Sequence, residues 1–224
     1  MAMAEGASAP SEPATGKATL VWHENRSVHR TAIFTSTATQ ISSSALGPYS
    51  TYLVDLDEDG DLDVISGSCN DNKIAWHENS FPSWTTWTIS TNADCAEVLG
   101  AGDIDRDGDI DVLSASFDDD RVAWYENDGS DPPIWTQQTI STSADGAWGL
   151  GVGDLDQDGD LDVVSTSLND QKVMWYENNG LIPVGWIGHL IVPSGPVPRA
   201  IEVVDIDRDG DLDIIGPRVS PGTI

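Results

Sequence analysis

The chain has 224 residues, of which 38 are Asp or Glu and ten are Lys or Arg, so that its formal net charge is −28. Nucleic acids and anionic membrane surfaces repel a chain this acidic, which excludes both as partners that bind by direct electrostatic attraction. The sequence contains no run of 18 apolar residues, and insertion into a membrane is therefore not expected.

The N-terminal segment differs in composition from the rest of the chain. Residues 1–18 are rich in Ala, Ser, Pro and Gly and lack the hydrophobic stretch of a signal peptide. We interpret them as a flexible linker or a cloning remnant. Residues 19–224 are expected to form one domain built from repeats.

An acidic loop of nine residues occurs four times, at 55–63, 103–111, 154–162 and 205–213, with starts 48, 51 and 51 residues apart. Carboxylates that alternate around a Gly at position 6 can surround a hard cation, and the Gly permits the sharp turn. A solvated acidic turn is the alternative, but fixed spacing and fourfold recurrence favour four Ca²⁺ sites. The predicted ligands are the Asp residues at positions 1, 3, 5, 7 and 9: Asp55, Asp57, Asp59, Asp61, Asp63, Asp103, Asp105, Asp107, Asp109, Asp111, Asp154, Asp156, Asp158, Asp160, Asp162, Asp205, Asp207, Asp209, Asp211 and Asp213.

The residues after each loop argue against an EF-hand. An EF-hand requires a bidentate Glu at position 12 and flanking helices. Position 12 is instead occupied by Ser66, Ser114, Ser165 and Gly216, and each loop is followed by an aliphatic, mostly β-branched pair such as Val64-Ile65. We therefore expect strands on both sides of each loop.

A longer unit recurs around each loop. Trp76, Trp124 and Trp175 each follow the first Asp of their loop by 21 residues, within the motif WHEN or WYEN, and a Thr- and Trp-rich segment such as WTTWTIS completes the unit. Each unit thus predicts four short strands in about 51 residues. Four-stranded units of this length are typical of propeller blades, so the fold class is all-β and the architecture a propeller of four blades.

The two ends of the repeat array are complementary. The first WHEN, at 22–25, has no acidic loop before it, and the last loop has no such motif after it. We expect the N-terminal strands, near 19–25 and 31–41, to complete the blade begun by residues 199–217. This pairing would close the ring and cover its edge strands.

The DxDxDGDxD loop followed by an aliphatic strand resembles the FG-GAP and VCBS repeats, which are calcium-binding blades of integrin α-subunit propellers and of many secreted proteins. The resemblance covers about 19–217. It implies that Asp55, Asp57, Asp59 and Asp63 bind Ca²⁺ through their side chains and Asp61 through its backbone carbonyl, and likewise in the other loops. Since this family usually builds about seven blades, the alternative is a fragment of a larger propeller.

The variable positions of the repeat suggest a ligand surface. Tyr49, Glu97, Trp148 and Arg199 each stand six residues before an acidic loop and differ in size and charge. In a propeller they would lie on the face opposite the loops, near the central axis. We interpret them as candidate ligand-binding residues, against the alternative of tolerated variation. The WxEN tryptophans are interpreted as packing residues between blades, not as sugar-stacking platforms.

The two cysteines allow two interpretations. Cys69 and Cys95 both fall in turns predicted on the face opposite the acidic loops, and they either form a disulfide or remain two free thiols.

Calcium binding is the chemistry that the motifs indicate, and no catalytic arrangement recurs, so we expect no enzyme. The favoured function is an extracellular recognition module that binds a glycan or a protein, as lectin-like or cell-adhesion domains do. The alternatives are a scaffold segment of a larger assembly and an accessory domain of a secreted polysaccharide-active enzyme. Calcium loops of this kind fit an extracellular, cell-surface or periplasmic location. A closed ring would be monomeric, and an open one would be an oligomer or part of a longer chain.

Overall fold

The computed structural model describes residues 20–22, 38–193, 195 and 198–217. The segment 1–18, predicted to be a linker, lies outside these residues. The described part is all-β, as predicted, with 16 strands and no helix. No described helix is therefore long and apolar enough to cross a membrane.

Three sheets of four antiparallel strands follow one another along the chain, and in each the strands pair in sequence order. The first contains β3 (Pro48–Val54), β4 (Asp63–Ser68), β5 (Lys73–Ser80) and β6 (Ser83–Ser90). The second contains β7 (Ala96–Gly102), β8 (Asp111–Ser116), β9 (Arg121–Asn127) and β10 (Trp135–Ser141). The third contains β11 (Ala147–Gly153), β12 (Asp162–Ser167), β13 (Lys172–Asn178) and β14 (Trp186–Val192). The sheets are consistent with propeller blades and confirm the predicted unit of four strands.

Each acidic loop joins the first strand of a sheet to the second. The pairs Val54–Asp63, Gly102–Asp111 and Gly153–Asp162 close the first three loops at their base. Strands therefore flank the loops, as the β-branched residues after each loop predicted.

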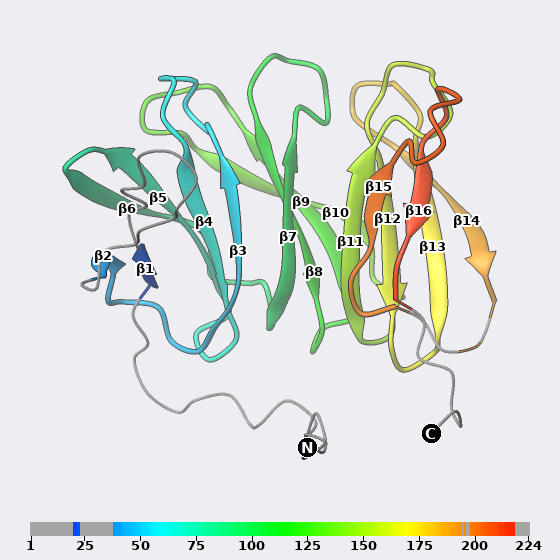
Figure 1. Cartoon of the computed structure of the whole chain (residues 1–224), viewed down its shortest axis with the longest axis horizontal. Helices are drawn as coiled ribbons and strands as arrows, with labels where there is room; N and C mark the ends of the chain where they lie inside the picture. Colours follow the sequence, from blue (N-terminus) through cyan, green and yellow to red (C-terminus); the bar gives the residue numbers. More distant parts are fainter. Residues whose placement is uncertain (1–19, 23–37, 194, 196–197, 218–224) are drawn as a thin grey trace, which may run out of the picture.

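The sheets stack face to face, with their first strands side by side. β3 lies against β7, β7 against β11, and β11 against the short strand β15 (Glu202–Val204) (Figure 1). Glycine permits this approach: a Cβ on Gly151 would stand 2.7 Å from the Val203 side chain. The first strands of the four units thus form one row. The acidic loops lie next to one another, at the end of the row where each first strand ends.

The hydrophobic core fills the spaces between sheets. Ile65, Ile74 and Trp76 of the first sheet pack with Leu99 and other residues of the second. A second cluster joins the second sheet to the third in the same way. In β4, β8 and β12 all six residues of each strand are buried, which explains why most of the side chains on both faces of these strands are apolar or small. Each large aliphatic side chain buried here contributes about 1.5–3 kcal/mol.

The predicted closure of the ring is wrong for the described strands. β1 (Leu20–Trp22) pairs with β2 (Thr39–Ser42), and β15 pairs with β16 (Asp213–Ile215). The β1–β2 pair lies beside β6 and the β15–β16 pair beside β11, on opposite sides of the molecule (Figure 1). Three complete sheets separate the two pairs, so that the described strands do not form a closed ring. The described chain therefore holds three complete four-stranded units and two half units.

Candidate functional site

The four acidic loops share one hydrogen-bond pattern, in which positions are numbered 1 to 9 within each loop. The Gly N–H at position 6 donates to the carboxylate at position 1: Gly60 to Asp55, Gly108 to Asp103, Gly159 to Asp154 and Gly210 to Asp205, at 3.1–3.2 Å. The N–H at position 5 donates to position 3, and that at position 7 to position 5, in every loop. The backbone thus holds the carboxylates of positions 1, 3 and 5 on the inside of the turn.

Two positions of the loop have left-handed backbone. The Gly at position 6 has φ between 95° and 102° in all four loops. Position 4 also has positive φ, although it is occupied by Glu58, Arg106, Gln157 and Arg208. Such angles are strained for residues with a Cβ and are found where the surrounding structure requires them. The same strained turn in four different sequences indicates a common geometric requirement.

Carboxylate oxygens converge in each loop. In the first and third loops the oxygens of positions 1, 3 and 5 lie within 4.8 Å of one another, and in the second and fourth those of positions 1, 3 and 9 do. Asp55 Oδ1 and Asp103 Oδ1 are buried and accept no hydrogen bond from any described residue. Three converging carboxylates supply hard oxygen donors of the kind that Ca²⁺ prefers, as part of the 6–8 oxygen ligands that it takes at about 2.3–2.6 Å.

Burial and mutual repulsion raise the pKa of several carboxylates at positions 3 and 9 of the loops. Burial raises the pKa of Asp111 to about 7, against which the hydrogen bonds from Asn127 and Ile104 act. Burial is also the largest cause that raises the pKa of Asp57, Asp105 and Asp156, and neighbouring carboxylates add to it. A divalent cation would remove this repulsion, because it stabilises the charged form.

The Asp at position 9 joins the loop to the third strand of its sheet. Asp63 Oδ1 accepts the backbone N–H of Asn79 at 2.7 Å, and its Oδ2 accepts the indole N–H of Trp76 at 2.9 Å. The same Asn N–H bond recurs from Asn127 to Asp111 and from Asn178 to Asp162. The Asn side chain also donates to the carbonyl at position 8.

We did not predict this role of the WxEN motif from the sequence. The signal was available as a constant spacing of 16 residues between the Asp at position 9 and the Asn. The prediction that the tryptophans pack between sheets agrees with the burial of Trp76 and Trp124, which are 2% and 3% exposed. His77 of WHEN is buried between Ser66 and Thr86, and burial lowers its pKa to about 4, so that it stays neutral.

In the third and fourth loops the Asp side chain at position 7 contacts the preceding loop. Arg106, at position 4 of the second loop, forms an ion pair of 2.7 Å with Asp160 of the third loop and donates to the carbonyl of Gly180. Gln157 of the third loop donates in the same way to Asp211 of the fourth. The side chains of Asp160 and Asp211 therefore link adjacent loops, which leaves the backbone carbonyl of position 7 as the group that could face a bound ion.

Three of the four predicted ligand-binding residues come together on the face opposite the acidic loops. The Arg199 guanidinium lies 4.8 Å from the ring centre of Trp148, and Phe117 meets the same ring edge to face at 5.6 Å. Arg199 also acts electrostatically on Glu97. We call Glu97, Phe117, Trp148 and Arg199 the rim cluster. Tyr49, the fourth predicted residue, is 39% exposed on the neighbouring first strand, β3.

The disulfide borders the rim cluster. Cys69 and Cys95 are bridged, which joins the turn after β4 to the start of β7 in the next sheet. Cys95 Sγ lies 3.3 Å from Glu97 Oε1. Burial and the nearby Asp118 raise the pKa of Glu97 to about 7, although Arg199 acts in the opposite direction. The corresponding contact one blade further on is apolar, since the Phe117 ring lies against Gly146.

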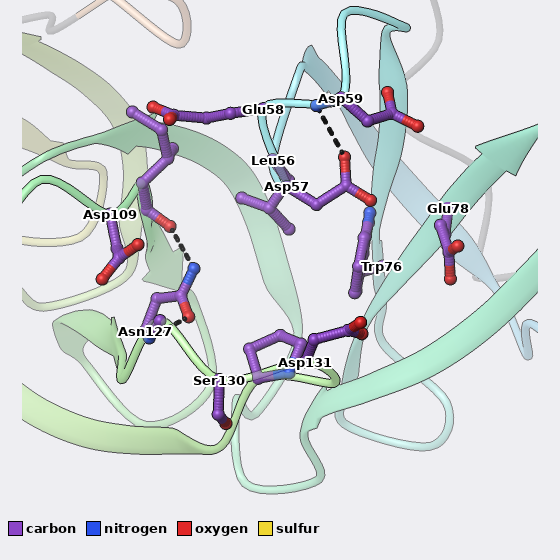
Figure 2. Close-up of a pocket in the computed structure, with 13 residues that line it drawn as sticks. Leu56, Asp57, Glu58, Asp59, Trp76, Glu78, Asp109, Asn127, Ser130 and Asp131 are labelled. Carbon is purple, nitrogen blue, oxygen red and sulfur yellow. Dashed lines mark hydrogen bonds between the residues drawn. The ribbon is translucent and has the colours of Figure 1, made fainter.

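A cavity of about 350 Å³ lies between the first and second sheets on the side of the acidic loops. Figure 2 shows Asp57 and Asp59 on one side of it and Asp131, from the loop between β9 and β10, on the other. Trp76 and Glu78 complete part of the lining. We did not predict this cavity from the sequence, because its walls come from two units whose relative placement the sequence does not give. At the next junction, Arg106 bridges the corresponding two loops.

Comparison with known proteins bears on the family and on the fold. A family model described as FG-GAP-like repeat matches residues 55–114, 103–165 and 154–216. No curated protein matches the chain by sequence. Among solved structures, the chain is similar to an Agrocybe aegerita lectin whose structure was described as the basis of specific recognition of non-reducing terminal N-acetylglucosamine. The TM-score is 0.58 at 16% identity, over 90% of this chain and 58% of the lectin chain.

Proposed function

Since the chain belongs to the FG-GAP-like repeat family, we propose that it is a non-enzymatic, calcium-stabilised recognition module whose ligand is a glycan. The observation that carries the proposal is the convergence of Glu97, Trp148 and Arg199 in the rim cluster. An aromatic ring with a few charged groups beside it is the usual composition of a small-ligand site. Sugar hydroxyls would bond to the charged groups and a sugar ring would pack on the exposed part of the indole.

Calcium would serve the fold in this proposal. Four ions would bind the loops 55–63, 103–111, 154–162 and 205–213, with positions 1, 3, 5 and 9 as side-chain ligands and position 7 as a carbonyl ligand. The converging oxygens and the buried, unpaired Asp55 and Asp103 oxygens support this assignment. The ions would offset part of the negative charge of the loops, and the rim cluster would bind the ligand at the opposite face.

An environment with abundant Ca²⁺ and an oxidising redox state fits both features. Disulfides persist in secreted, surface-exposed and periplasmic proteins and are rare in the cytosol. The Cys69–Cys95 bridge therefore supports the proposed extracellular, cell-surface or periplasmic location.

A glycan array probed in excess Ca²⁺ and again in EDTA tests the function. We expect calcium-dependent binding that Trp148→Ala abolishes and Phe81→Ala retains, since Phe81 is an exposed aromatic in the turn between β5 and β6, at the end of its sheet that carries the acidic loop. If Trp148→Ala bound normally and Asp131→Asn did not, the glycan site would lie in the cavity of Figure 2 instead. Absence of binding to any glycan would contradict the proposal and favour the scaffold function.

A further inference from the structure

The cavity between the first and second sheets is acidic, whereas an arginine side chain bridges the corresponding two loops at the next junction. We propose that this cavity binds a guanidinium group from outside the chain, carried by an arginine side chain of another protein or by a small guanidinium compound. The inference does not depend on the glycan proposal, because the cavity lies on the side of the acidic loops and the rim cluster on the opposite face.

The junction between the second and third sheets shows how the fold holds a guanidinium. Arg106, at position 4 of the second loop, pairs through Nε with Asp160 at position 7 of the third loop, at 2.7 Å. Its Nη2 donates to the carbonyl of Gly180, two residues after the WxEN asparagine, at 3.1 Å. The side chain of Asp160 is 6% exposed in this contact. Position 7 of one loop and this glycine therefore form a receptor for a guanidinium group.

The first junction has the same receptor without the arginine. Asp109 and Gly129 hold the two receptor positions, and the Asp109 carboxylate lies against the α-carbon of Gly129 just as its counterpart does one sheet further on. Position 4 of the first loop is Glu58 in place of Arg106. Figure 2 shows Glu58 extending towards the side of the cavity where Asp109 lies. An ionised carboxylate only accepts hydrogen bonds, so Glu58 cannot bridge the loops as the arginine does.

The third junction also has a donor at position 4. Gln157 of the third loop donates to the side chain of Asp211 at 2.6 Å and to the carbonyl of Gly210 at 2.8 Å. Among the junctions between described loops, the first alone therefore places an acid opposite the Asp of position 7. The guanidinium contact in the next unit, and not the acidic cluster alone, identifies the ligand.

The lining of the cavity suits a cationic group. Thirteen residues line it, and none of these described residues is basic. Six of the thirteen are acidic, and two of those six are proposed calcium ligands of the first loop. The carboxylates left for another cation are those of Glu58, Glu78, Asp109 and Asp131.

The size and the charge of the site favour a single guanidinium. The volume of about 350 Å³ lies at the lower end of the range of about 300–1,000 Å³ for ligand pockets, which fits one side chain. A planar guanidinium can donate to carboxylates of two loops at once, whereas an ammonium is a compact point charge. The net charge of −28 also attracts cationic groups towards the chain.

Calorimetry with the full chain in saturating Ca²⁺ tests the proposal, because the acidic loops are then filled. The probes are capped tripeptides with Arg, Lys or the neutral isostere citrulline between two glycines, and methylguanidinium. We expect the Arg peptide to bind at least about tenfold more tightly than the citrulline peptide, since charge-assisted hydrogen bonds are lost with citrulline. Binding of the peptide alone would assign the site to protein arginines, and binding of methylguanidinium as well would show that the group itself suffices. Equal affinity for the Arg and citrulline peptides, or no binding of either guanidinium probe, would overturn the proposal.

Two variants locate the binding in the cavity. Glu58→Arg should abolish binding of the Arg peptide and raise the melting temperature, because the chain then supplies its own bridge; position 4 accepts arginine in the second loop at the same left-handed backbone angle. Asp109→Asn should weaken binding at least about tenfold but leave the number of bound Ca²⁺ ions unchanged, since the backbone carbonyl is retained.

Asp118→Asn is the matched control, because it removes one charge at an exposed residue of the turn between β8 and β9, on the opposite face. It should bind the Arg peptide as the parent does. A Glu58→Arg variant that binds like the parent, or equal weakening by Asp118→Asn and Asp109→Asn, would show that the peptide does not occupy the cavity.

Discussion

Arg106→Ala is expected to destabilise the chain by breaking the contact between the second and third acidic loops. Arg106 Nε lies 2.7 Å from Asp160 Oδ1, and Nη2 donates to the Gly180 carbonyl at 3.1 Å. The Asp160 side chain is 6% exposed and that of Arg106 is 51% exposed. The variant therefore leaves a buried carboxylate without its cation.

The magnitude follows from this unequal exposure. Removal of one partner costs about 3–5 kcal/mol for a fully buried ion pair and about 0.2–1 kcal/mol for an exposed one. Since the guanidinium is half exposed and water can reach it, we expect a loss of about 1–2 kcal/mol. For a chain of this size that corresponds to a melting temperature lower by roughly 2–8 °C.

Thermal melting in saturating Ca²⁺ measures the effect, and Arg208→Ala is the control. Arg208 holds the same position in the fourth loop and makes no ion pair with a described residue, so its removal should change the free energy of unfolding by less than about 0.5 kcal/mol. Arg106→Gln should recover part of the loss, because Gln157 bridges the next pair of loops. Equal melting of the Arg106→Ala and Arg208→Ala variants would show that the ion pair with Asp160 does not stabilise the fold.

Three further predictions concern the loops and the disulfide. In EDTA, the melting temperature should fall as pH rises from about 4 to 7. The pKa of Asp111 is raised by folding, so over this range the folded chain keeps a proton on Asp111 that the unfolded chain has lost. Saturating Ca²⁺ should remove this dependence of the melting temperature on pH. Asp156→Asn should weaken one calcium site and leave the other three, which calorimetry would record as one tight site fewer. Replacing Cys69 and Cys95 together by Ser should cost about 3 kcal/mol in denaturant unfolding, and an unchanged midpoint would show that the bridge does not constrain the unfolded chain.

The local features of the fold could be predicted from the sequence because they repeat. The alternation of Asp around Gly60 and its three counterparts, followed by an aliphatic strand, predicted the loops and their flanking strands. The burial of Trp76 followed from the need to fill the space between stacked sheets. In these cases one short segment of sequence is enough to predict the local structure.

The features that failed or were missed depend on contacts between segments. Closure of the ring was expected from the matching halves at the two ends, but such a match in sequence does not give the placement in space of the three sheets that lie between β2 and β15. The bond between Asn79 and Asp63 was missed because its donor is a backbone N–H, so that the constant spacing of the two residues was the sole sign of it in the sequence. The cavity beside Asp57 and Asp131 likewise needs the placement of two sheets.

Calcium titration of the metal-free chain, followed by calorimetry and by thermal melting, is the decisive experiment on the four acidic loops. We predict four bound ions and a rise in stability of about 2.7 kcal/mol per site once the free ion exceeds the dissociation constant about 100-fold. Absence of binding heat together with the same melting temperature in Ca²⁺ and in EDTA would contradict calcium binding by these loops.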